Sequence, residues 1–194
     1  KSNESLSAPD IQINFTPGTH QRGMQSTLEN QAGFTMATWQ HRPESYGYVR
    51  ARSQDPFKHP EIQPNYLAAD TDQQVILAAI KTCRKLAQTE ALRPFIVNET
   101  FPGAACQNDD ELLNSAREIG QSIYHLMGTC RMGNRDDKTA VVDAELRVHG
   151  IKNLRVIDAS IMPTMVSANL NAAVMMIAEK GADMVLGKLS AKPH

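Results

Sequence analysis

The sequence predicts an α+β fold, in which an antiparallel sheet is backed by helices and a C-terminal strand and helix belong to an α/β layer. Three observations predict this fold. Short segments that alternate apolar and polar residues occupy the first part of the chain. Helical stripes of apolar residues follow in the middle. A long run rich in Ala, Met, Val and Ile lies near the end of the sequence.

Three segments in the first part of the chain are predicted to be strands. Residues 11–15 alternate apolar and polar side chains, as a half-buried strand does, and residues 34–39 and 47–52 are the other two. Residues 43–47 predict a turn between the second and third strands, and short connections favour antiparallel pairing. We therefore expect one antiparallel sheet over about residues 10–66.

Two helices are predicted to follow these strands. Apolar side chains at helical spacing form a stripe over residues 72–88. Thr71 stands three residues before Gln74, which predicts a capping box at the start of this helix. Asn108 and Glu111 have the same spacing and predict a cap for the second helix. We expect the first helix to cover the sheet.

The last third of the chain has a different pattern. Residues 154–157 predict a short strand that ends at Asp158, and a polar loop follows. The apolar run then predicts a helix from about residue 169 to residue 186, buried on several sides. Strand, polar loop and buried helix are typical of the end of an α/β nucleotide-binding layer.

Composition excludes several classes of protein. The 194 residues include 20 Lys and Arg and 21 Asp and Glu, and 41% of the residues are hydrophobic, which fits a globular chain with a core. This balanced charge argues against a nucleic-acid partner, which normally needs a basic face for phosphates, although a small local basic patch stays open. No apolar run reaches the roughly 20 residues that cross a bilayer, so no transmembrane segment is expected.

The cysteines indicate the redox environment. Cys83, Cys106 and Cys130 are odd in number and form no CxxC motif. They fit neither a disulfide framework nor a zinc site, and no metal is expected. Reduced thiols are usual in a cytoplasm. We therefore expect a cytoplasmic protein, with peripheral attachment to a membrane left open.

Local motifs identify few candidates for chemistry. The chain contains neither GxGxxG nor a Walker motif, so a self-contained dinucleotide or ATP site is not expected. His125 lies in residues 124–133, which contain two glycines and show no regular periodicity. Such a loop can hold a polar side chain toward a cavity. A single histidine is also often a hydrogen-bonded structural residue, so the sequence leaves both interpretations open.

Polar residues at the start of the last predicted helix also have two interpretations. Asn169 and Asn171 flank Leu170, and Asn is a preferred N-cap residue. The same helix end offers free N–H groups and a positive dipole that suit an anion. Asp158 is either a turn residue or a ligand of a sugar hydroxyl, since cofactors bind at the carboxyl ends of such strands.

Residues 124–187 resemble the C-terminal signature of the glucose–methanol–choline (GMC) flavin oxidoreductases. The matching stretches, in order, are HLMGTCRMG at 125–133, VVD at 141–143, LRVHG at 146–150, NLRVIDASIMP at 153–163, NLNA at 169–172 and IAEK at 177–180. Upstream, RPES at 42–45, GYVR at 47–50 and IQPNYL at 62–67 are similar to the substrate domain of this family. Nearly the whole chain is covered, and so many ordered matches make the resemblance specific.

The resemblance implies a division of the chain. Residues 1–134 would be a substrate-binding domain that ends in the loop of the catalytic histidine. Residues 135–194 would be the C-terminal segment of an FAD-binding domain. The Gly-rich FAD-binding region that precedes them in the family is absent from these residues. We therefore expect a C-terminal portion whose partner is the N-terminal FAD-binding half of the same enzyme, with a homo-oligomer left open.

The resemblance also implies an activity, the oxidation of an alcohol to an aldehyde or ketone by an FAD-dependent dehydrogenase or oxidase. His125 corresponds to the family's base, which takes the hydroxyl proton while a hydride moves to flavin N5. Imidazole is chemically suited to this role. Asn169 corresponds to the second active-site residue, which orients the substrate oxygen.

The expected cofactor contacts follow in the same way. Asp158 and Ala159 correspond to the segment that passes the ribityl and phosphate part of FAD. Leu170 and Asn171 correspond to the helix start near the flavin pyrimidine ring.

Two questions stay open at the level of sequence. Asn169, Leu170 and Asn171 resemble the choline and aliphatic-alcohol branches of the family, but the substrate is not identified. The alternative to an enzyme is a non-catalytic module that only binds a partner polypeptide. Without the FAD fingerprint, the chain by itself is expected to be inactive.

Overall fold

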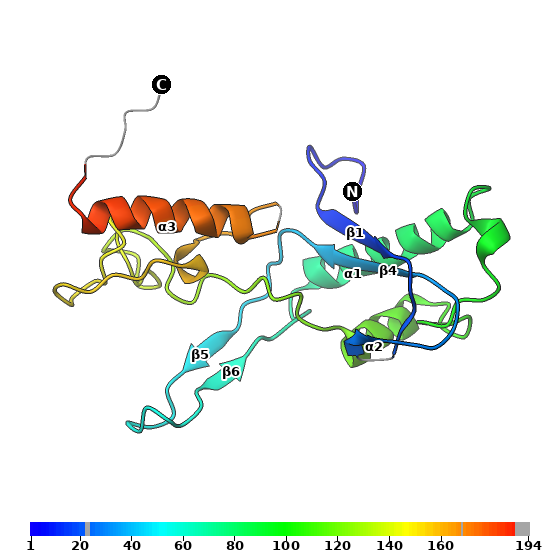
Figure 1. Ribbon diagram of the computed structural model, residues 1–194, viewed down its shortest axis with the longest axis horizontal. Helices are drawn as coiled ribbons and strands as arrows, with labels where there is room; N and C mark the ends of the chain where they lie inside the picture. The colour runs from blue at the N-terminus through cyan, green and yellow to red at the C-terminus, as the bar shows by residue number, and fades with distance from the viewer. Residues whose placement is uncertain (22–23, 168, 189–194) are drawn as a thin grey trace. The chain divides into compact units, whose positions relative to one another are not determined.

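A computed structural model describes residues 1–21, 24–167 and 169–188 and divides the chain into two compact units (Figure 1). The first unit consists of residues 1–47 and 64–122, and the second of residues 48–63 and 123–194. Within the described residues, small antiparallel sheets and three α-helices form a mixed fold, which confirms the predicted α+β class.

The first unit contains the best-formed sheet. Strand β1 (Ile11–Thr16) pairs antiparallel with β4 (Thr35–Gln40) over six residue pairs. These strands confirm the predictions for residues 11–15 and 34–39. Between them the chain forms a hairpin of β2 (His20–Gln21) and β3 (Met24–Leu28), which the sequence pattern did not predict.

The strands do not join into the single sheet that the sequence predicts. Strand β5 (Tyr48–Arg50) confirms the third predicted strand, but it pairs with β6 (Glu61–Gln63) in the second unit and not with β4. The described strands therefore form three separate two-stranded ladders. The predicted pairing across residues 43–47 is wrong because this connection bonds to the helix that follows.

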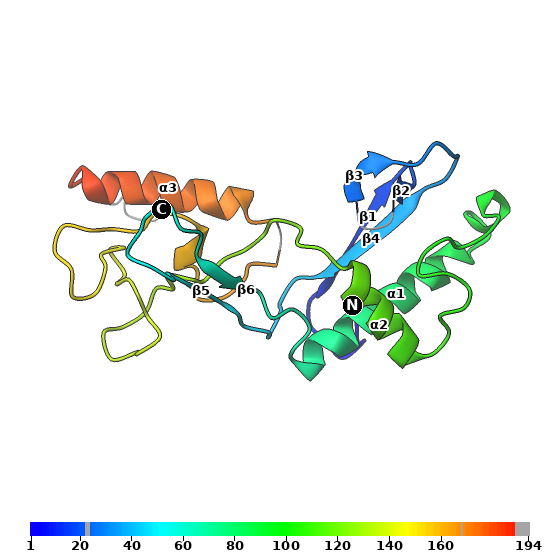
Figure 2. The same ribbon diagram turned by 90° about the horizontal axis from the view of Figure 1, so that it is seen from below.

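Helices α1 (Asp70–Ala87) and α2 (Asp109–Ile119) complete the first unit (Figure 2). Helix α1 contacts β4, β1 and α2, so it covers the sheet as predicted. An ion pair of 2.6 Å between Lys81 Nζ and Asp109 Oδ1 links the two helices.

The two predicted helix caps have different outcomes. Asn108 accepts a hydrogen bond from the Glu111 backbone, and the Glu111 carboxylate accepts one from the Asn108 backbone, so this capping box is confirmed. The predicted cap at Thr71 is wrong, because the helix begins earlier, with Ala69 at the N-cap. Thr71 therefore lies inside the first turn of α1.

Asp72 takes the anchoring role in that first turn. Its carboxylate is only 2% exposed and accepts hydrogen bonds from the Glu44 and Ser45 backbone N–H groups, both at 2.8 Å, and from the Ser45 hydroxyl at 2.5 Å. Burial alone would raise the pKa of Asp72, but the hydrogen bonds from Ser45 and Glu44 outweigh burial and lower it. The side chain therefore ties the RPES segment to α1.

The second unit is built around a buried apolar cluster with little regular structure. Its centre consists of Val142, Leu146, Ile161, Met162, Leu170 and Ile177. The predicted strand over residues 154–157 is wrong, because this segment contributes only an isolated bridge between Arg155 and Arg147. Tight turns with positive φ at Leu146, Gly150 and Asn153 fold the chain back too often for a ladder to extend.

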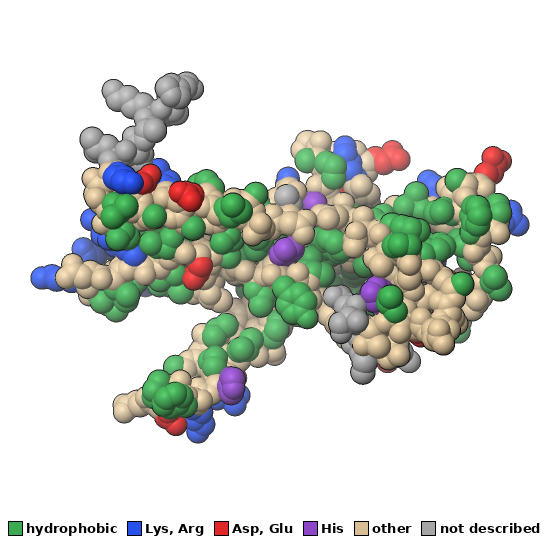
Figure 3. All heavy atoms as spheres, in the orientation of Figure 1, with side chains coloured by type: hydrophobic (Ala, Val, Ile, Leu, Met, Phe, Trp, Pro, Cys, Tyr) green, Lys and Arg blue, Asp and Glu red, His purple; other side chains and the backbone are tan. Residues whose placement is uncertain are grey.

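Helix α3 (Asn171–Val185) lies on this cluster and confirms the predicted C-terminal helix. One face is buried, whereas Met175, Met176 and Leu186 are exposed, so burial on several sides is not observed in the described residues. Figure 3 shows apolar side chains at the surface over this helix. No helix in the described part of the chain is long and apolar enough to cross a membrane.

Gly181 allows α3 to approach the preceding segment closely. It is buried, and a Cβ atom at this position would clash with Cγ2 of the Ile157 side chain and lie 3.1 Å from its Cδ1 atom. Glycine in a helix costs about 1 kcal/mol relative to alanine. The close contact therefore explains why glycine is tolerated here.

The substitution Asp72→Asn should lower the free energy of unfolding at pH 7 by roughly 1.5–3 kcal/mol, because an amide NH₂ would face hydrogen-bond donors. The lowered pKa means that the ionised carboxylate stabilises the fold above about pH 4, and that this contribution is lost as the pH falls through the folded pKa. Urea unfolding at pH 7 and pH 3 measures both effects. The exposed neighbour Asp70→Asn is the control, and equal losses in the two variants would contradict the prediction.

Gly181→Ala should destabilise the chain by about 1–3 kcal/mol despite the better helix propensity of alanine, because the new methyl group overpacks Ile157. Adding Ile157→Ala should reduce the destabilisation caused by the alanine at position 181. Denaturant unfolding of the two single variants and the double variant measures this coupling. A Gly181→Ala variant more stable than its parent would show that the contact imposes no constraint.

Candidate functional site

The loop that contains His125 runs beside the segment that follows Asp158. The backbone N–H of Gly128 donates to the Ala159 carbonyl at 3.4 Å, that of Cys130 to Ser160 at 2.9 Å, and that of Met132 to Ile161 at 2.7 Å. These three bonds, between residues 128–132 and residues 159–161, are called the backbone ladder below. The ladder brings the predicted base loop and the predicted cofactor segment together.

The structure also brings His125 and Asn169 together. The Asn169 amide Nδ2 lies 2.8 Å from His125 Nε2, although 44 residues separate them along the chain. With the Asn169 amide in this orientation its nitrogen donates, so Nε2 of a neutral imidazole is the acceptor and the ring proton is assigned to Nδ1. His125 is half-buried and Asn169 is exposed. The pair thus presents a basic nitrogen and a neutral donor at one accessible point.

The start of α3 differs from the predicted cap. The N-cap is Leu170, which is buried and provides no side-chain hydrogen bond, so the N-cap interpretation of Asn169 is wrong. Asn171 begins the helix, and its amide lies 3.8 Å from the sulfur of Met175. The first turn contains no acidic side chain. Backbone N–H groups at this end therefore face no carboxylate from their own turn.

Asp158 has a clear structural role. It is the N-cap of the 3₁₀ turn Ala159–Ile161, and its Oδ1 atom accepts from the Ser160 backbone at 2.8 Å and from the Ser160 hydroxyl at 2.5 Å. The turn-residue interpretation is confirmed. A contact from Asp158 to a cofactor sugar stays a prediction.

Tyr124, which precedes His125, was missed by sequence reasoning. Its backbone has φ of 61°, and its side chain is 84% exposed. A bulky residue in the left-handed region is uncommon, and such conformations cluster at functional sites. No local sequence signal indicates this conformation, because Tyr has no preference for it.

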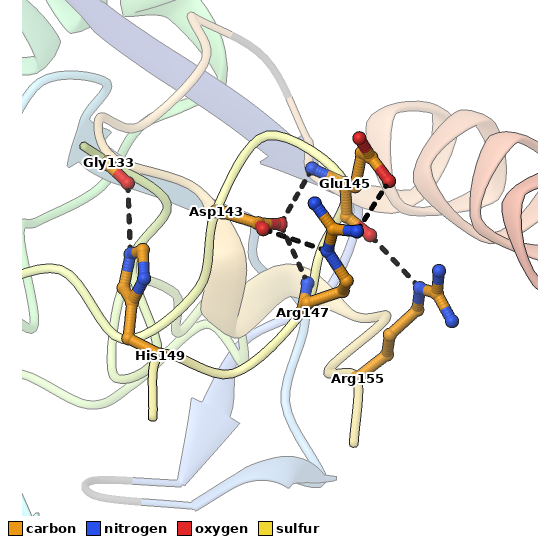
Figure 4. A network of polar contacts seen from close by, with 6 residues as sticks. All are labelled: Gly133, Asp143, Glu145, Arg147, His149 and Arg155. Carbon is orange, nitrogen blue, oxygen red and sulfur yellow. Dashed lines mark hydrogen bonds and ion pairs between the residues drawn. The ribbon is translucent and has the colours of Figure 1, made fainter. Parts of the chain in front are cut away.

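A polar network organises the segment between the loop of His125 and Asp158 (Figure 4). Asp143 accepts hydrogen bonds from the Glu145 backbone at 2.8 Å, the Arg147 backbone at 3.0 Å and the Arg147 Nε at 2.9 Å. Arg155 Nε donates to the Glu145 carbonyl at 3.1 Å. Burial would raise the pKa of Asp143, but hydrogen bonds from Arg147 and Glu145 lower it overall. The ionised carboxylate therefore holds this turn together.

The residues present fit a cofactor with acceptor or anionic groups better than they fit a metal. The start of α3 has no capping side chain and no acidic residue, and the nearby Ala159 has only a methyl side chain. In contrast, the described residues contain no group of three His, Cys, Asp or Glu side chains placed to hold a metal ion. Cys83, Cys106 and Cys130 are free thiols.

Known proteins resemble this chain over nearly its whole length. The chain is 43% identical to human mitochondrial choline dehydrogenase and 41% identical to an oxygen-dependent choline dehydrogenase of Escherichia coli, in each case over 97% of its residues. It spans about a third of the length of these relatives, 32% and 33%. Among solved structures, pyridoxine 4-oxidase from Mesorbium loti matches 93% of this chain and 35% of its own, with a TM-score of 0.79 and 28% identity.

A family model described as GMC oxidoreductase matches residues 43–178, which include the loop of His125, Asp158 and the start of α3. This match covers well over half of the chain and agrees with the order of the matching motifs. The chain therefore belongs to the GMC oxidoreductase family.

Proposed function

We propose that this chain provides the proton-accepting site of an FAD-dependent alcohol dehydrogenase or oxidase. The observation that carries the proposal is the 2.8 Å contact between Asn169 Nδ2 and His125 Nε2. It places a lone pair and a donor side by side at an accessible position. Membership of the GMC family supports the redox class, and the relatives named choline dehydrogenase support an alcohol as the substrate.

The pair can handle a hydroxyl group as follows. An alcohol oxygen within about 2.8 Å of both nitrogens would donate its hydrogen to His125 Nε2 and accept one from Asn169 Nδ2. As the proton moves to Nε2, the oxygen gains negative charge, and both nitrogens then donate to it. Asn169 thus stabilises the charge that the base creates. FAD, when bound, supplies the acceptor for the hydride that leaves the carbinol carbon.

The proposed cofactor contacts lie around this pair. Asp158 and Ala159 would border the ribityl and phosphate part, and Leu170 and Asn171 would border the flavin ring. Support comes from the backbone ladder, which joins the Asp158 segment to the base loop. The start of α3 favours negative charge through its N–H groups and helix dipole.

A partner polypeptide is part of the proposal. Met175 and Met176 on α3 and Leu186 at its C-cap are exposed apolar side chains, and exposed apolar surface can mark contacts with other polypeptides. We assign this surface to the FAD-binding half of the enzyme, with a homo-oligomer as the second possibility. The division into a substrate-binding part, residues 1–134, and an FAD-binding part, residues 135–194, belongs to the same proposal. Without the FAD-binding half, this chain should not catalyse the oxidation of an alcohol.

Choline or a related amino alcohol is the substrate class that we favour. Tyr124 presents an exposed ring directly before the base, and an aromatic face attracts a quaternary ammonium group. The names of the relatives agree with this choice. The second candidate function, a module that only binds a partner, is supported by the exposed surface of α3 but does not require the paired His125 and Asn169.

In the FAD-loaded enzyme of full length, His125→Ala should lower the rate of flavin reduction by roughly 10²–10⁴, the usual size of a lost general base. Asn169→Ala should lower it less, because the base remains. Anaerobic stopped-flow reduction by an alcohol measures both rates, and flavin absorbance measures bound FAD, which should be retained. Exposed His59→Ala is the control. Reduction of the His125→Ala variant at the parent rate would refute the proposed base, and loss of FAD would indicate a structural histidine.

Tyr124→Leu should raise the KM for choline by about 2- to 30-fold, the range of a lost cation–π contact. The KM for 3,3-dimethylbutan-1-ol, a neutral alcohol of the same shape, should change much less. Tyr124→Phe retains an aromatic face and serves as the matched control. Steady-state kinetics of the three proteins with the two alcohols measure the difference. Equal changes for both alcohols would exclude recognition of the cation by this ring.

A further inference from the structure

Gly133 ends the loop that contains His125, and both its backbone N–H and its carbonyl form hydrogen bonds. Its N–H donates to the Val142 carbonyl at 3.0 Å, and its carbonyl accepts from His149 Nε2 at 3.2 Å (Figure 4). A Cβ atom at position 133 would lie only 2.9 Å from that of Ala140. The end of the loop is therefore fixed by main-chain bonds and by close packing.

His149 is well placed to act as the anchor. Its own N–H donates to the Val141 carbonyl at 2.9 Å, and the neighbouring Val148 forms a bridge with Val142. Val142 is fully buried and forms a second bridge, with Met132. The half-buried imidazole thus reaches Gly133 from a position next to Val148, whose bridge to the buried Val142 holds this part of the backbone.

The backbone ladder is tightest at the end that His149 holds. Its N···O distances shorten from 3.4 Å at Gly128 to 2.9 Å at Cys130 and 2.7 Å at Met132. A distance of 3.4 Å is beyond the usual range for an N–H···O bond. The shortest of the three bonds is therefore the one next to Gly133.

We propose that His149 is a positioning residue, which places His125 through the hydrogen bond to the Gly133 carbonyl. This inference rests on the proposed function, since it assumes that His125 is the base. His149 itself does not contact the substrate. When its bond is lost, the Gly133 carbonyl loses its side-chain partner, and the end of the loop keeps only its main-chain bonds to Val142 and Ile161. A small shift of the Gly133 carbonyl then moves the loop and the base with it. A displacement of about 1 Å at a reacting group can cost roughly 100-fold in rate.

The test compares two replacements of His149 in the FAD-loaded enzyme of full length. His149→Phe keeps a ring but removes the donor, whereas His149→Gln keeps an N–H group of similar reach. We expect His149→Phe to lower the limiting rate of flavin reduction by about 10- to 100-fold, with FAD content and the Kd of the alcohol close to those of the parent. His149→Gln should recover most of the rate. His59→Phe, an exposed histidine of the same unit, should match the parent.

A parent rate in His149→Phe, or equal rates in the Phe and Gln variants, would overturn the inference. If His149→Phe does not fold, His149→Glu takes its place, because Glu has the shape of Gln without the donor. His125→Ala is measured beside them. A slow His125→Ala with a fast His149→Phe would overturn the positioning role alone, whereas a fast His125→Ala would refute the proposed base as well.

Discussion

The backbone ladder between residues 128–132 and 159–161 is the constraint on which the second unit depends. It joins two segments that have almost no regular secondary structure, and it uses their main-chain groups instead of particular side chains. Ile161 and Met162, at the end of this turn, lie in the same buried cluster as Leu170, the N-cap of α3. The loop of His125, the turn and the start of α3 are therefore held by one core, which brings the side chains of His125 and Asn169 together.

Local patterns in the sequence predicted the elements that local forces stabilise. The apolar stripe of α1 and the cap at Asn108 were found because each lies within one or two helical turns. Pairing was not predictable, since alternation indicates a strand but not its partner. The cap expected at Thr71 failed for a tertiary reason. Asp72 bonds the distant Ser45 and Glu44, which ties the connection after β4 to α1.

Local sequence patterns also do not predict which residues of the candidate site contact each other. Residue type and spacing left His125 open between a base and a structural histidine, and Asn169 open between a cap and an anion site. The resemblance to a family selected both residues, but neither source indicated that their side chains bond to each other. His149 stood in a matching stretch without a role, because a histidine that donates to a distant carbonyl leaves no local pattern. The left-handed backbone conformation of Tyr124 could not be predicted from the sequence either.

Several carboxylates of the structure already have structural roles, which agrees with the proposal that the base is the histidine His125. Hydrogen bonds from Thr139 lower the pKa of Asp137, and in Asp72 and Asp143 hydrogen bonds outweigh burial, so all three favour the ionised form. Each is committed to holding a turn or a helix end, and protonating it would weaken the fold. Asp158 Oδ1 likewise accepts hydrogen bonds from the backbone and the hydroxyl of Ser160. The imidazole of His125 differs because its bond is to Asn169, a neutral side chain, and in the proposed function an alcohol oxygen binds at this pair.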